Sequence, residues 1–410
     1  MSVVGRPKFA DDGRKITAVG SETSKHSLEQ RPESPRRPSK ILKVNDDIAD
    51  SYVEEADQSA SSMSKKQMNP NPRLQRYLIA IEYIGTRFAG AQQQSNCRTV
   101  VGVLEEAFKK FIGQPVSIFC SSRTDAGVHA LSNVCHVDVE RISKRKPDKV
   151  QSLHAILDAI FTMGYPKTVS LCFSIGLPPH EPEVVKRAVN HFLQKNEGDV
   201  TIIDVCSVAA DFHARYKAQE RTYFYRILCG PEPLSTFEKD RAWHVPEELD
   251  LLAMQQACRI LVGHHDFSSF RAAACQAKSP IRSLDELSVT EVASTPYFPS
   301  ILEMYPSDAV MSGLPETLNA KTLEGRNEFG VRRRHRCLLV TARARSFLYH
   351  QVRLLVGVLK AVGSGDLGVP DVERILNAKT VTAASPMAPS SGLYLGHVKY
   401  DVEDLKNSPS

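Results

Sequence analysis

Hydrophobic residues recur with strand or helix spacing over most of the chain beyond residue 72. Residues 77–83 are rich in aliphatic and aromatic side chains and end just before Gly85, which predicts a strand. A helix is predicted between Thr99, which can cap it, and Gly113, which can end it. Its apolar stripe consists of Leu104, Ala107, Phe108 and Phe111.

The same patterns continue along the chain. Strands are predicted at 116–120, 133–139, 221–228 and 337–342. Helices are predicted at about 247–262, ending at Gly263, and at about 348–362, ending at Gly363. This succession predicts an α+β fold with a mixed or antiparallel sheet, helices on one side and two similar halves.

Differences in composition along the chain indicate where its tails, its two halves and its insertions lie. We expect a disordered N-terminal tail at 1–72, an N-terminal half at 73–208, a C-terminal half at 209–401 and a C-terminal tail at 402–410. The tail is rich in Ser, Pro and charged residues and poor in aromatic residues, so it buries too little apolar surface to fold alone. Residues near 150–180 and 293–336 fit the strand and helix pattern poorly and are expected to be insertions.

The overall composition narrows the class of protein. The 410 residues are 42% hydrophobic and 24% charged with net charge +5, which permits a nucleic-acid partner without requiring one. Nine cysteines without a Cys-x-x-Cys pair or zinc spacing indicate reduced thiols in an intracellular protein without a metal site. We expect no secretory signal and no membrane span, because the apolar stretch at about 155–177 is interrupted by charged residues, Gly and Pro.

The stretch Ser-Ser-Arg-Thr-Asp-Ala-Gly-Val-His-Ala at 121–130 carries the strongest chemical signal. It places Asp125 on a tight turn of small residues directly after a predicted strand, where catalytic groups are often mounted. An Asp-Ala-Gly turn can also be purely structural. The neighbouring Cys120 is expected to have a core role, because it lies in an alternating strand.

This stretch resembles the active-site motif of the tRNA pseudouridine synthase A (TruA) family. Further segments that resemble the family follow in order: Phe212-His213-Ala214-Arg215, Arg221-Thr222-Tyr223-Phe224-Tyr225, His265 to Arg271, Ser346 to Arg353, and Ala388 to Leu395. The resemblance covers about 77–400 and is closest to the eukaryotic tRNA pseudouridine synthase-like branch. It implies two ferredoxin-like halves around a central RNA-binding cleft, a tRNA substrate, a homodimer and no organic or metal cofactor.

The resemblance also implies the reaction and its residues. Uridine is detached at its glycosidic nitrogen, rotated and rejoined through C5. Asp125 matches the catalytic aspartate, which acts as nucleophile or stabilises the sugar centre. Arg353 matches its basic partner, and Tyr223 matches the tyrosine that stacks on uracil and is a candidate for moving the C5 proton. Arg123 matches an arginine that helps displace the target base, although a phosphate contact is the alternative.

Other matched residues have open roles. Leu393 and Tyr394 resemble residues that line the uracil pocket, and core packing explains them equally well. Tyr225 is expected to be a core residue, and His129 a structural hydrogen-bonding residue. The candidates for phosphate contacts are Arg215, Arg271 and Lys278.

Two features depart from or add to the family pattern. The family often has Gly-Trp-Gln after the first strand, whereas this chain has Gly90-Ala91-Gln92-Gln93, which puts RNA contacts there in doubt. The basic run at 332–336 fits a solvated loop, an RNA contact or a nuclear-import signal.

Three hypotheses follow for the activity. The first is isomerisation of tRNA uridines, with the anticodon stem-loop as the expected target. The second is a non-catalytic RNA-binding or tRNA-folding protein, or a synthase for another RNA. The third is a nucleoside or glycoside hydrolase using Asp125, for which no second carboxylate is evident. The compartment, whether cytoplasm, nucleus or organelle, is not resolved.

Overall fold

The computed structural model describes residues 74–141, 178–196, 198–293 and 335–401, together with residues 403 and 405. These residues lie in one compact unit, Pro70–Ser410. The predicted tail at 1–72 and the greater part of both predicted insertions lie outside the described residues.

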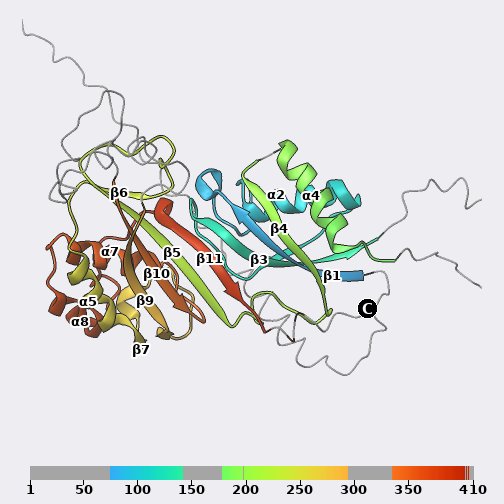
Figure 1. Ribbon diagram of the computed structural model, residues 1–410. Coiled ribbons are helices and arrows are strands. Elements are labelled where there is room, and N and C mark those ends of the chain that lie inside the picture. Colours follow the sequence, from blue (N-terminus) through green and yellow to red (C-terminus); the bar gives the residue numbers. More distant parts are fainter. Residues whose placement is uncertain are drawn as a thin grey trace, which may run out of the picture. The chain divides into compact units, whose positions relative to one another are not determined.

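The first half of the unit follows the pattern βαββαβ (Figure 1). Its elements are β1 Leu74–Tyr83, the 3-10 turn η1 Gly85–Arg87, α2 Val100–Ile112, β2 Ile118–Cys120, β3 His129–Glu140, α4 Pro182–Asn196 and β4 Val200–Val208. The strands pair in the order β4-β1-β3, with β2 also paired to β3. This is the 4-1-3-2 strand order of a ferredoxin-like unit.

The second half repeats this arrangement. Its main elements are β5 Glu220–Cys229, α5 Leu251–Leu261, β9 Glu286–Val292, β10 Arg336–Ala344, α7 Gln351–Gly363, α8 Val369–Ala378 and β11 Leu393–Lys399. The order β11-β5-β10-β9 is again 4-1-3-2 when the strands are numbered along the half. The additional elements are β6 Trp243–Val245, β7 Gly263–Asp266, η2 Ser268–Phe270, β8 Ile281–Leu284 and η5 Ser390–Gly392.

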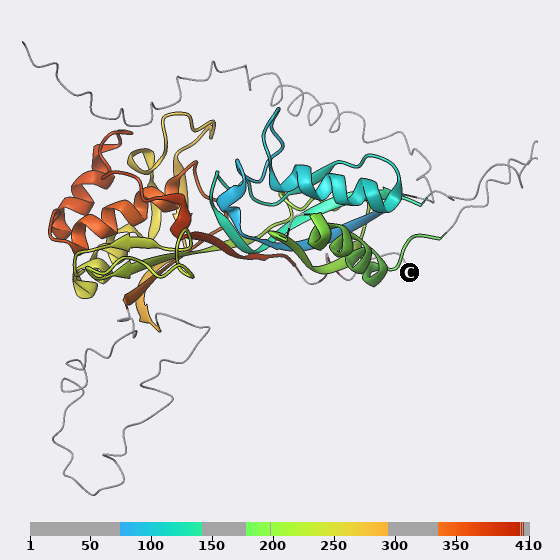
Figure 2. The ribbon, with the colours of Figure 1, turned by 90° about the horizontal axis from the view of Figure 1, so that it is seen from above.

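Strand β11 joins the two halves into one mixed sheet (Figure 1). It pairs antiparallel with β5 on one side and parallel with β3 on the other, through the registers Tyr394↔His129 and Leu395↔Ala130. Seen from above, the helices of the two halves lie toward opposite ends of this sheet (Figure 2). The α+β fold and mixed sheet expected from the sequence are confirmed.

Each half has its own hydrophobic core. Leu104, Phe108 and Val137 belong to the first core, and Leu338, Leu355 and Val356 belong to the second. Tyr223 packs against both cores, so it stands where the halves meet. Cys120 packs against the first core, as its strand position predicted.

Local signals set most element boundaries. Thr99 accepts a hydrogen bond from Gly102 N, and Gly113 ends α2 with φ 91°, as expected. The start of α5 was predicted too early, because the Asp250 side chain accepts from Ala253 N and caps the helix there. The start of α7 was also predicted too early, because His350 has a left-handed backbone with φ 62°.

The other boundary corrections concern strands and one glycine. Strand β2 is shorter than predicted and β3 longer. Gly363 is the last residue of α7 rather than its terminator, and Ser364 follows as the cap. Within the basic run, Arg336 opens β10 and its side chain bonds Glu291 at 2.8 Å and Leu249 O at 2.7 Å, whereas 332–334 lie outside the described residues.

Candidate active site

The loop that carries Asp125 connects β2 to β3 and is held by a buried polar network. Ser121 Oγ donates to Asn133 Oδ1 at 3.0 Å, and Asn133 Nδ2 donates to Ser122 O at 3.1 Å. Thr124 Oγ1 shares a 2.7 Å hydrogen bond with the Tyr83 hydroxyl. Because these groups are buried and mutually satisfied, they fix the backbone on both sides of Asp125.

The segment after β1 supports the loop from its other side. Ala91 N donates to Thr124 O at 3.0 Å, and Gly127 N donates to Phe88 O at 3.3 Å. Gly90 has φ 116°, and a side chain there would lie only 3.0 Å from Thr124 O. The departure Gly90-Ala91 therefore lies directly beneath the Asp125 loop, where Ala91 is buried.

Arg221 on β5 ties the loop to the second half of the molecule. Its guanidinium donates to Ser122 Oγ at 3.1 Å and to Ser121 O at 2.9 Å. It also donates to Arg215 O at 3.0 Å and Arg345 O at 2.5 Å. From the sequence, Arg221 has no expected role beyond its place in a strand. Its loop partners Ser121 and Ser122 lie about a hundred positions away, and no local signal marks them.

The Asp125 carboxylate lies between two side chains at the start of α7. Arg353 Nη1 is 3.6 Å and His350 Nε2 is 3.3 Å from Asp125 Oδ2. Burial raises the pKa of Asp125, and the nearby His350 and Arg353 oppose that rise only in part. The expectation that Arg353 would pair with Asp125 agrees with this geometry, but burial outweighs the charge in setting the pKa.

Tyr223 completes the cluster from β5. Its hydroxyl is hydrogen-bonded to the Ser122 side chain, and its ring meets Phe347 edge-on at 5.2 Å between centroids. Burial raises the pKa of Tyr223, and the Asp125 charge raises it further. The hydroxyl is therefore protonated at neutral pH. Asp125, Tyr223 and Arg353 thus converge from a loop, a strand and a helix that are far apart in the sequence.

Comparison with known proteins decides the family. A family model described as tRNA pseudouridine synthase matches residues 79–160 and 257–401. The tRNA pseudouridine synthase A of Rhodospirillum centenum is 36% identical over 80% of this chain and 100% of its own length. The chain belongs to the tRNA pseudouridine synthase family. The enzyme of the same name from Paramagnetospirillum magneticum is 34% identical over 82% of this chain and 99% of its own length.

Membership in this family confirms the resemblance inferred from the sequence motifs. The relatives named here are bacterial, and the closer likeness to the eukaryotic branch stays a prediction.

The remaining residues matched to the synthase family lie in different surroundings. Tyr225 is fully buried and donates to Pro389 O at 2.7 Å, in line with the expected core role. Leu393 is buried in the second core. Tyr394 stacks on His129 at 4.6 Å and donates to Arg241 O at 2.7 Å.

His129 is a structural link, as expected. Its Nδ1 accepts from Gly85 N at 3.1 Å, and its Nε2 lies 3.0 Å from Asp240 O. Burial lowers the pKa of His129, which favours the neutral ring.

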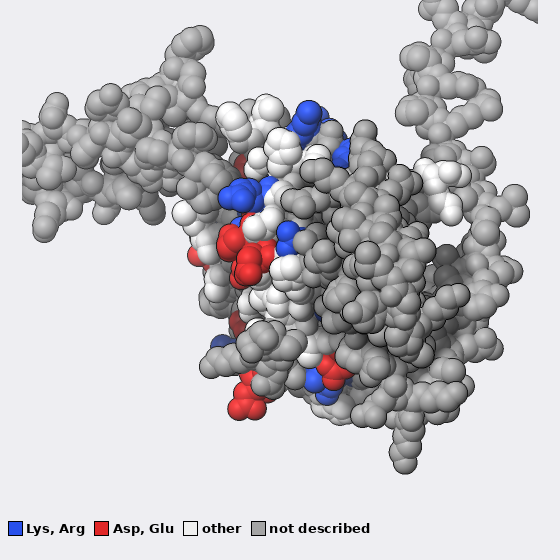
Figure 3. All heavy atoms as spheres, turned by 90° about the vertical axis from the view of Figure 1, so that its right-hand side faces the viewer, with Lys and Arg blue, Asp and Glu red and all other residues white. Residues whose placement is uncertain are grey.

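The candidate RNA-contacting residues lie at or near the surface. Arg123, Arg215 and Lys278 are exposed, and Arg271 is half-buried. On the side drawn in Figure 3, basic and acidic side chains of the described residues occur beside one another. The described part of that face therefore carries both signs of charge.

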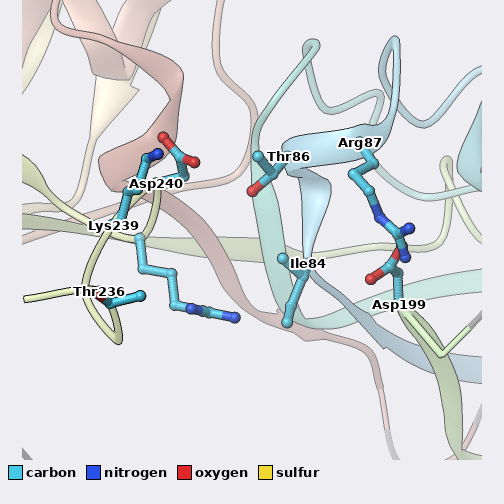
Figure 4. A pocket seen from close by; sticks show the side chains of 8 residues that line it. Ile84, Thr86, Arg87, Asp199, Thr236, Lys239 and Asp240 are labelled. Carbon is cyan, nitrogen blue, oxygen red and sulfur yellow. The ribbon is translucent and has the colours of Figure 1, made fainter.

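A separate open pocket lies between η1 and the loop before β6 (Figure 4). Its lining residues are Ile84, Thr86, Arg87, Asp199, Thr236, Lys239, Asp240 and Arg241. None of the predicted catalytic residues lines it, and its Arg87 is ion-paired with Asp199. Within the described ranges, no group of three or more His, Cys, Asp or Glu could hold a metal ion, and no helix could cross a membrane.

Proposed function

We propose that this protein converts specific uridines of tRNA to pseudouridine, with Asp125 as the carboxylate that acts at the ribose. The observation that carries the proposal is the convergence of Asp125, Arg353 and Tyr223 in a chain of the tRNA pseudouridine synthase family. The reaction breaks the N1–C1′ bond and forms a C5–C1′ bond. A proton leaves C5 and N1 gains one, so no redox partner is needed.

Asp125, Arg353 and Tyr223 have different roles in this reaction. Asp125, when ionised, attacks C1′ or stabilises the cationic character that develops there. Arg353 favours the ionised carboxylate, because its guanidinium lies 3.6 Å from Oδ2 and is anchored by a 2.8 Å hydrogen bond from Nε to Ala388 O. Tyr223 offers a ring on which uracil can stack and a protonated hydroxyl beside the carboxylate.

The proposal also covers the part of the tRNA that is modified and the oligomeric state of the protein. We propose the anticodon stem-loop as the site of modification and a homodimer as the working form, on the basis of the likeness to tRNA pseudouridine synthase A proteins. Arg123 is the candidate for displacing the base, a role supported by its exposure two residues before Asp125. Size-exclusion chromatography with light scattering would give the mass of a dimer or of a monomer.

The experiment maps pseudouridine on unmodified tRNA transcripts by carbodiimide labelling and primer extension. The wild-type protein is expected to produce stops at defined uridines of the anticodon stem-loop, and Asp125→Asn is expected to produce none. Asp211→Asn, at an exposed aspartate, is the matched control and should behave as wild type. Stops elsewhere in the tRNA would refute the proposed target, and equal stops with Asp125→Asn would refute the role of Asp125.

A further inference from the structure

His350 contacts the same carboxylate oxygen as Arg353, and the sequence motifs gave it no role. Its Nε2 lies 3.3 Å from Asp125 Oδ2, closer than Arg353 Nη1 at 3.6 Å. The side chains of His350 and Asp125 are 16% and 21% exposed, so the contact is shielded from most water while still open to a substrate. Oδ2 thus has two partners, three residues apart on one chain segment.

The backbone at His350 is unusual and well anchored. Its φ of 62° lies in the left-handed region, which non-glycine residues seldom adopt outside constrained or functional sites. Its carbonyl accepts from Leu354 N at 3.0 Å in the first turn of α7. The Tyr349 ring stacks on the imidazole at 3.7 Å between centroids. In this conformation the imidazole lies against the Asp125 carboxylate, with Nε2 3.3 Å from Oδ2.

The charged groups around the His350 imidazole indicate its charge state and which ring nitrogen carries the hydrogen. The titratable and charged groups that interact with this cluster, among the described residues, are Asp125, Arg353, Tyr349 and Tyr223. Burial lowers the pKa of His350, Asp125 opposes that change, and Arg353 adds to it. The ring is therefore neutral at neutral pH, and an ionised carboxylate beside Nε2 selects the tautomer that carries the proton there.

We infer that His350 is a positioning residue, which donates its Nε2 hydrogen to Asp125 Oδ2 and holds the carboxylate in the orientation needed at the ribose. The inference rests on the proposed function of Asp125. Arg353 contributes both charge and a hydrogen bond to the carboxylate, and His350 Nε2 lies within donor reach of the same oxygen at 3.3 Å. A hydrogen bond to the ionised form also favours that form, so His350 widens the pH range over which Asp125 is charged.

The test compares His350→Gln with His350→Leu in the full chain. The two substitutes have similar size and meet the same left-handed backbone, but only glutamine can donate a hydrogen bond. Single-turnover rates of pseudouridine formation are measured on one tRNA from pH 5 to 9, beside filter-binding affinity and melting temperature. His191→Leu, at an exposed histidine of α4, is the control.

His350→Leu is expected to slow the single-turnover rate by about 10- to 100-fold, the effect of losing a hydrogen bond to a charged group. Its tRNA affinity should stay within about twofold of wild type, since the lost contact is internal. The acid limb of its rate profile should move to higher pH, because the pKa of Asp125 rises without the donor. His350→Gln should recover most of the rate and the wild-type acid limb.

Two results would overturn the inference. One is a His350→Leu rate and pH profile equal to wild type. The other is an equal loss in both variants with a lowered melting temperature, which would mean a structural role only. Asp125→Asn, measured in parallel, distinguishes a failure of the inference on His350 from a failure of the proposed function of Asp125. If that variant is inactive while His350→Leu is fully active, only the inference on His350 fails. If Asp125→Asn is active, the proposed function of Asp125 fails with it.

Discussion

Replacing Arg221 should damage the active site from a distance, because this residue ties the Asp125 loop to the second half of the sheet. Arg221→Met keeps the length of the side chain and removes every hydrogen bond of the guanidinium. The lost partners are Ser122 Oγ, Ser121 O, Arg215 O and Arg345 O.

The size of the effect follows from the burial of those partners. Water can replace the donor at Arg215 and Arg345, which are exposed residues. It cannot readily do so at Ser121 and Ser122, which are 3% and 7% exposed. Ser122 Oγ keeps its hydrogen bond to the Tyr223 hydroxyl, so Ser121 O is the buried acceptor that is left without the guanidinium donor. That costs roughly 1–3 kcal/mol in the free energy of unfolding. The weakened contact at Ser122 Oγ and the removal of a buried guanidinium act in opposite directions, which leaves a loss of about 1–3 kcal/mol.

Two assays check this reasoning. At roughly 2–4 °C per kcal/mol for a large domain, the melting temperature should fall by about 2–12 °C. Displacement of the loop should also slow single-turnover pseudouridine formation by roughly 100-fold at a temperature where the variant is still folded. Arg343→Met is the matched control, since Arg343 on β10 makes solvent-screened ion pairs with Glu220 and Glu286. An Arg221→Met protein with the melting temperature and rate of wild type would refute the argument.

Three further predictions concern charge and packing. Because burial raises the pKa of Asp125, its ionised form destabilises the fold, so Asp125→Asn should melt above wild type at pH 7. The difference should vanish as the pH falls toward about 4, and thermal scans across pH that show no such trend would contradict it. Arg123→Ala and Arg215→Ala should each lower the slope of log Kd for tRNA against log salt by about 0.7–0.9 if each contacts one phosphate, measured by filter binding. Gly85→Ala should lower the melting temperature far more than Gly368→Ala, because its Cβ would lie 1.9 Å from Val128 O whereas that of Gly368 meets nothing closer than 3.5 Å.

Local sequence signals predicted the parts of the site that depend on neighbouring residues. The Asp125 loop follows a strand and contains Ala126 and Gly127, so its position and sharp turn could be inferred directly. The Thr99 cap and the Gly113 terminator likewise determine α2 through contacts within a few residues. The apolar stripe around Arg353 indicated that this arginine lies beside a buried surface, and it does.

The features of the site and the sheet that the sequence did not predict depend on contacts between distant segments of the chain. Arg221 was interpreted only as a strand residue, because its partners Ser121 and Ser122 become neighbours only when the halves join. The pairing of β11 with both β3 and β5 has no local signal either, since it links positions far apart in the chain. His350 was missed because its contact with Asp125 joins segments that are far apart in the sequence, and its residue type does not predict the left-handed backbone found there.

The central claim is that this chain isomerises uridine through Asp125, and release of tritium from tRNA labelled at uridine C5 tests it most directly. Formation of the C5–C1′ bond expels that hydrogen, so each pseudouridine formed releases one label. The account predicts release by the wild type, none by Asp125→Asn, and full release by Asp211→Asn. Tight, salt-sensitive tRNA binding without any release by the wild type would contradict it and favour a non-catalytic RNA-binding protein or a synthase for another RNA.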